Sequence, residues 1–119
     1  MRAVIREMRL LGDYGPVDGY SSADPSNDGV WLRLMIGPAD GPGEESFDIL
    51  VCTPAWLSRE VKSHGPQIGR HHLVVETMVL SDVADFLRRV VESVEGDDWS
   101  DVGSKLSRLG RWEFEDYRA

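Results

Sequence analysis

Few side chains in this sequence have the type and spacing that metal binding requires. His71 and His72 are adjacent in a segment that is typical of a β-strand, and adjacent side chains in a strand point to opposite faces. Two such histidines cannot easily share one ion, and the sequence has neither an HExxH motif nor a second cysteine beside Cys52. We therefore predict no metal site, with one imidazole facing the core and the other facing solvent.

Nucleophilic and acid–base chemistry have no better support. Cys52 lies inside an apolar strand, where a buried structural thiol is expected rather than a nucleophile. The carboxylates of Asp82, Asp97 and Asp98 are explained by the starts of helices, where the helix dipole favours negative charge. The glycine-rich segment 37–46 (GPADGPGEES) lacks the lysine and the strand-to-helix context of a phosphate loop. We therefore predict no catalytic residue and no cofactor.

The chain is acidic, with a formal net charge of −8 and an isoelectric point near 4.7. Such a surface repels the phosphates of nucleic acid, so nucleic acid is excluded as a nonspecific partner. The same charge serves solubility, and it also permits a basic protein partner, which a complementary field would attract.

The compartment is indicated by the cysteine count and by the start of the chain. One cysteine can form no intrachain disulfide, so a reducing compartment is expected. Charges interrupt the opening segment MRAVIREMRLLGDYG, which therefore does not resemble a signal peptide. No apolar run approaches the length of a membrane span. We expect a cytoplasmic protein that does not bind membranes.

Alternating apolar residues predict strands over residues 2–11, 30–36, 47–52 and 69–79. Between the first two, residues 12–29 form a long loop, rich in glycine and aspartate, and such loops are often functional in small domains. The second and third strands are expected to form a hairpin. In the first strand, alternation places Ala3, Ile5 and Glu7 on one face and Val4, Arg6, Met8 and Leu10 on the other.

The segment FDILVCTPAWL (47–57) predicts a strand that leads directly into a helix. Thr53 can cap this helix, and Pro54 suits its first position because the missing N–H would be unpaired there. The helix should end before His64, because glycine and proline follow. Helical spacing predicts a second helix over 81–95 and a third that ends at Gly110. The last nine residues read as a strand or an extended tail.

These elements predict one α+β domain over residues 1–119, with a single antiparallel sheet and helices packed on one face. Leu32, Leu34, Phe86 and Val90 are expected to share its core.

Four segments are similar to the immunity protein 8 family of bacterial polymorphic toxin systems: WLRLMIGP (31–38), FDILVCTPAWL (47–57), GRHHLVVE (69–76) and VESVEGDDWSDVGSKLSRLGRWEFEDY (91–117). The order of IGP, CTPxWL, EGDxW and GRWEFEDY carries the resemblance, which covers most of the chain after Val30. It implies a non-enzymatic protein that binds and neutralises a cognate toxin domain stoichiometrically. The alternative from the residues is a small enzyme or a housekeeping ligand-binding domain of unknown substrate.

The toxin-binding residues are predicted from the acidic loops. A nuclease must be basic where it holds phosphate, so an acidic protein can occupy that site, and loops commonly carry recognition. A second acidic segment, from Glu92 to Asp101, is explained nearly as well by helix capping. An exposed tryptophan would supply an apolar anchor. The predicted contacts are Asp40, Glu44 and Glu45 at the hairpin tip, Asp13, Asp18, Asp24 and Asp28 in the first loop, and Trp31.

Overall fold

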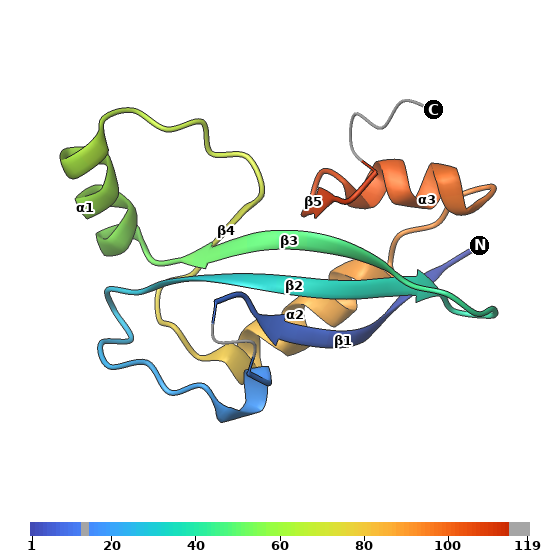
Figure 1. Ribbon diagram of the computed structural model, residues 1–119, viewed down its shortest axis with the longest axis horizontal. Coiled ribbons are helices and arrows are strands. Elements are labelled where there is room, and N and C mark those ends of the chain that lie inside the picture. The colour runs from blue at the N-terminus through green and yellow to red at the C-terminus, as the bar shows by residue number, and fades with distance from the viewer. Residues whose placement is uncertain (13–14, 115–119) are drawn as a thin grey trace.

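The computed structural model describes residues 1–12 and 15–114, and in this part of the chain five strands form one sheet (Figure 1). Three helices and one short 3-10 helix accompany the sheet. The strands are β1 (Ala3–Leu10), β2 (Gly29–Pro38), β3 (Glu45–Cys52), β4 (His72–Val74) and β5 (Arg111–Trp112). The helices are α1 (Pro54–His64), α2 (Leu80–Glu92) and α3 (Trp99–Leu106), with η1 at Val17–Gly19.

The strand β3 is the centre of the sheet. Strands β1, β2 and β3 form an antiparallel meander, and β5 pairs antiparallel with the first half of β3. The short strand β4 runs parallel to the second half of β3, after the crossover through α1. The α+β class predicted from the sequence, with one predominantly antiparallel sheet, is confirmed.

The predicted alternation in β1 is wrong after Ile5. The register with β2 shifts between Ile5 and Glu7, as in a β-bulge, so one extra residue enters the strand there. The extra residue exchanges the two faces, and Glu7 becomes exposed. The buried residues of β1 are therefore Ala3, Ile5, Met8 and Leu10.

The fourth strand is much shorter than the predicted span of residues 69–79. Only three residues pair with β3, because His71 before them has a positive φ of 62° and the chain leaves the sheet after Val75. The backbone N–H of Val75 makes the last bond to this edge, to the carbonyl of Cys52 (2.9 Å).

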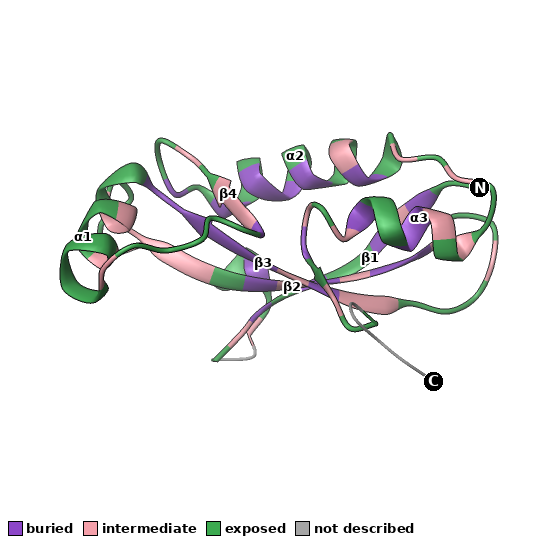
Figure 2. Ribbon diagram, turned by 90° about the horizontal axis from the view of Figure 1, so that it is seen from above, coloured by how far each residue is buried: buried purple, intermediate pink, exposed green. Residues whose placement is uncertain are grey.

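The helix α2 covers one face of the sheet and turns its buried side towards it (Figure 2). Leu80, Val83, Ala84, Leu87 and Val91 form this side, and the α3 residues Val102 and Leu106 join the same core. The prediction that Phe86 lies in this core is wrong, because its side chain is 42% exposed and Val90 is only half-buried. Both residues lie on one flank of the buried stripe, beyond Val83, and Leu87 is near its centre.

Candidate functional site

The predicted contact residues do not form one surface. The first loop precedes β2 and the acidic hairpin tip follows it, so the two loops lie at opposite ends of this strand (Figure 1). A strand of ten residues separates its ends by about 30 Å. A compact partner site would therefore contact one of the two loops and not both.

The hairpin tip, residues 38–44, is held by a side chain from β1. The guanidinium of Arg6 donates hydrogen bonds to the carbonyl oxygens of Pro38 (2.7 Å), Gly41 (2.6 Å) and Gly43 (3.2 Å). A Cβ atom at Gly37 would lie 2.0 Å from the carbonyl oxygen of Gly43, so this close approach requires glycine.

The three predicted carboxylates of the hairpin have different surroundings. Asp40 and Glu44 are exposed and can meet a partner. Glu45 is half-buried, and its Oε1 accepts hydrogen bonds from the indole Nε1 atoms of Trp99 and Trp112. Glu45 therefore ties β3 to α3 and β5, and this role in the fold was not visible in the sequence.

The hairpin tip and the segment from Glu92 to Asp101 lie at the same end of the molecule. Trp99 joins Pro38, Pro42, Gly43, Glu44 and Glu45 in lining one hollow. Arg2 connects the two segments as well, because its carbonyl accepts from Ala39 N–H and its side chain pairs with Glu95. The hairpin tip and the segment from Glu92 to Asp101, which the sequence offers as alternative binding surfaces, are therefore neighbours. We call this surface the acidic end and define it by six exposed carboxylates: Asp40, Glu44, Glu92, Glu95, Asp97 and Asp98.

Three basic side chains beside the acidic end, those of Arg2, Arg6 and Lys105, already have partners. Arg2 pairs with Glu95 and donates to the carbonyl of Glu92 (3.0 Å), while Arg6 is bound inside the hairpin tip. Lys105 lies 3.4 Å from Asp101 and donates to the carbonyl of Glu95 (2.6 Å). The backbone N–H of Asp97, and then Lys105, lower the pKa of Asp101.

In the first loop, Asp28 is engaged within the fold. Its carboxylate accepts hydrogen bonds from Tyr20 Oη, Ser22 Oγ (2.7 Å) and the backbone N–H of Gly29 (2.9 Å). Its own N–H donates to Thr53 Oγ1 (3.1 Å), which also accepts from Trp56 N–H as the cap of α1. Burial, followed by the hydrogen bond and charge of Asp28, raises the pKa of Tyr20 to about 12.

The other predicted acids of this loop divide into two groups. Asp18 and Asp24 are exposed, and Asp24 Oδ1 accepts a hydrogen bond from Ser26 Oγ (2.9 Å). Asp13 lies outside the described residues.

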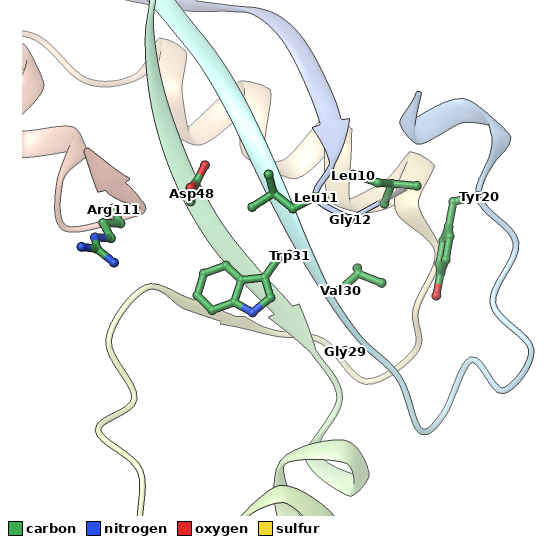
Figure 3. Close-up of a pocket in the computed structure, with 9 residues that line it drawn as sticks. All are labelled: Leu10, Leu11, Gly12, Tyr20, Gly29, Val30, Trp31, Asp48 and Arg111. Atoms are coloured by element: carbon green, nitrogen blue, oxygen red, sulfur yellow. The ribbon is translucent and has the colours of Figure 1, made fainter. Parts of the chain in front are cut away.

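Trp31 projects from the face of the sheet opposite α2 and is 43% exposed. Figure 3 shows its ring with Asp48 and Arg111 to one side and Val30 and Tyr20 to the other. Together with Leu10, Leu11, Gly12 and Gly29, these residues line a hollow of about 630 Å³. The nearby guanidinium of Arg33 holds Asp48 through two bonds of 2.9 and 3.0 Å. Trp31 is accessible, and its role as an anchor stays a prediction.

The cysteine and the two histidines considered for nucleophilic or metal chemistry do not form a common site. Cys52 is buried, as predicted, and burial raises the pKa of its thiol. His71 is buried and its Nε2 lies 2.8 Å from the carbonyl of Ser107, whereas His72 is half-buried with Nδ1 2.7 Å from the carbonyl of Arg70. Within residues 1–12 and 15–114, no three histidine, cysteine or acidic side chains gather as a metal site would require.

One surface was missed by the sequence reasoning. The first helix was expected to place its apolar side on the sheet, yet α1 has no buried residue. Trp56 packs closely against the backbone of Gly29, where an added Cβ would lie 2.3 Å from the indole. Between α1 and β4 remains a groove of about 670 Å³. Its lining residues are Pro54, Leu57, Ser58, Val61, Lys62, Gln67, Gly69, His72 and Val74.

The described helices are all too short or too polar to cross a membrane.

Comparison with known proteins gives one match. A family model described as Immunity protein 8 matches residues 3–117 of the 119-residue chain. A search of curated proteins and a search of solved structures each found no match.

Proposed function

The chain belongs to the immunity protein 8 family, and from this premise we propose that it binds and neutralises a cognate toxin domain of a bacterial polymorphic toxin system. The family match over nearly the whole chain is the observation that carries the proposal. Neutralisation occurs by stoichiometric protein–protein contact in the cytoplasm. The chain acts as one binding domain over residues 1–119 and has no enzymatic activity of its own.

The toxin surface that approaches the acidic end is basic, as in a nuclease. Support comes from the net charge of −8 and from the exposed carboxylates that remain after the local cations are paired. Complementary charge acts mainly on the association rate. Asp40 and Glu44 are the best-placed of the predicted contacts, because the tip that carries them is held by Arg6. Glu45 and Asp28 support the binding surfaces from within the fold.

Co-expression tests this function. The gene for this chain is expressed together with the toxin domain encoded beside it, and survival is compared with that of cells expressing the toxin domain alone. Rescue of growth and co-purification of a complex of fixed stoichiometry are expected. Unrelieved toxicity with no complex between the purified proteins would reject the proposal. Hydrolysis of nucleic acid, peptide or ester that a single carboxylate or histidine substitution abolishes would favour a small enzyme instead.

A further inference from the structure

Exposed apolar side chains are concentrated away from the acidic end. Neither the hairpin tip (38–44) nor the segment 92–101 contains an exposed large hydrophobic residue. The groove between α1 and β4 is bordered by Val61 (44% exposed) and Val74 (51%), and the segment between these elements carries Ile68 (90%). Stable interfaces have a desolvated apolar core with a few dominant contacts. At the acidic end the exposed large hydrophobic residue is Met1 (53%), which is hydrogen-bonded to Gly96, whereas Val61, Ile68 and Val74 gather at the groove.

A row of paired residues crosses the sheet from the groove to Trp31. Trp31 pairs with Leu50, and Leu50 pairs with His72, so the three residues form one row across β2, β3 and β4. Leu50 lies outside the core cluster beneath α2, yet it is only 4% exposed. It therefore forms a closed apolar floor between the exposed indole of Trp31 and the groove residue His72.

One wall of the groove carries a positive charge, although the protein as a whole is acidic. Lys62 lines the groove, and Arg59, which does not line it, is exposed elsewhere on the same helix. Neither side chain makes an ion pair or hydrogen bond with another described residue. The carboxylate of α1, Glu60, is already bound to His64 Nδ1 (2.9 Å). The complementary occupant is therefore apolar with flanking carboxylates.

A second copy of this chain fits the groove poorly. Its acidic end would offer carboxylates to Lys62, but the exposed large apolar side chain there is Met1, a single residue against walls that include Val61 and Val74. A toxin domain can carry several apolar side chains next to its carboxylates.

We propose that the toxin domain inserts an apolar segment with flanking carboxylates into the groove between α1 and β4. This inference rests on the proposed function and assigns the surface that holds the complex together. The groove governs dissociation, and the acidic end governs the rate of encounter.

The test uses the full chain and the toxin domain encoded beside its gene. The groove variant combines Val61→Asp with Lys62→Glu. The matched control combines Val79→Asp at the N-cap of α2 with Arg89→Glu in its last turn, which changes the same charges at residues of comparable exposure. Association and dissociation are followed by surface-based kinetics, and thermal unfolding verifies that both variants are folded.

The groove variant should dissociate about thirtyfold faster or more, the change expected when a dominant contact is lost. Its association rate should stay within about threefold of wild type, and the control should change neither rate beyond that limit. Wild-type dissociation of the groove variant would overturn the inference while the proposed function stands. Failure of the wild-type chain to bind the toxin would overturn both. Sedimentation of the chain alone is the last measurement. If the wild-type chain self-associates and the groove variant does not, a second copy occupies the groove and the inference is overturned.

Discussion

The Nη2 atom of Arg6 donates a 2.6 Å hydrogen bond to the carbonyl oxygen of Gly41, 35 residues further along the chain. Bonds to Pro38 and Gly43 complete the arrangement, so a side chain of β1 fixes the turn between β2 and β3. A loop ordered before binding loses less conformational entropy in a complex. The tip that carries Asp40 and Glu44 is therefore prepared for contact in the free protein.

Replacement of this guanidinium should loosen the tip. In Arg6→Met, backbone amides of residues 39–44 should exchange with deuterium faster, and the free energy of unfolding should fall by about 1 kcal/mol, because the bonds are exposed to water. Arg6→Lys keeps the charge but lacks the fork of donors, so it should recover only part of the protection. Unchanged exchange in Arg6→Met would show that the turn is held by its own backbone.

Charge reversal at the tip should slow toxin capture. Asp40→Lys combined with Glu44→Lys is expected to reduce the association rate about tenfold at low salt, and the difference should shrink as salt screens the charges. Dissociation should change little. The control combines Asp18→Lys with Asp24→Lys at the opposite end of β2. An equal effect of the control on the rate would mean that net charge, not the acidic end, directs the encounter.

Adjacent positions of α2 should differ sharply in their sensitivity to truncation. Leu87 is fully buried, so Leu87→Ala should cost about 2–5 kcal/mol of unfolding free energy. Phe86 is 42% exposed, so Phe86→Ala should cost clearly less than Leu87→Ala. Chemical denaturation of both variants measures the difference. A large loss in Phe86→Ala would contradict the orientation of α2 described above.

The phenol of Tyr20 should titrate at about pH 12 in the folded protein, because burial and then Asp28 raise its pKa from 10.0. The folded state holds this proton more tightly than the unfolded chain. The resulting stabilisation is complete below pH 10 and is lost as the pH rises towards 12. Ultraviolet difference spectra against Tyr20→Phe isolate this group. Asp28→Asn should lower the pKa only part of the way, since burial remains.

Thr53 joins the cap of α1 to the first loop. Thr53→Val keeps the shape of the buried side chain but removes the acceptor for Trp56 N–H and Asp28 N–H, at a cost of about 1–2 kcal/mol. Thr53→Ser retains the hydroxyl and should lose less. Equal stability of the valine and serine variants in chemical denaturation would show that the cap contributes little.

The sequence predicted the class, the family and the strand–helix junction correctly, because each depends on local pattern. The cap at Thr53 and the first helical position of Pro54 are both present. The family resemblance is confirmed by the match over residues 3–117. The face of β1 was missed because a bulge depends on the partner strand. The position of Phe86 was missed because the exact centre of an apolar stripe is set by tertiary packing.

The binding surfaces were less predictable than the fold. Charge identifies Asp28 and Glu45 as candidates, but only the structure shows that each carboxylate accepts hydrogen bonds from distant residues. The adjacency of the hairpin tip and the segment 92–101 arises from contacts between residues far apart in sequence. The groove beside α1 was invisible because its walls come from a helix and from a strand that the alternation placed in a longer element.

The pairing of β5 with β3 has a consequence for biosynthesis. The ring of Phe47 stacks on Trp112 with centroids 6.0 Å apart, and Trp112 is synthesised after β1 to β4 and all three described helices. Until then, the first half of β3 presents an open strand edge, the kind of surface through which nascent chains associate. The antiparallel meander can assemble early, but closure of the sheet over Phe47 is a late event of long sequence separation. Ribosome-associated chaperones would meet this protein with that edge still uncovered.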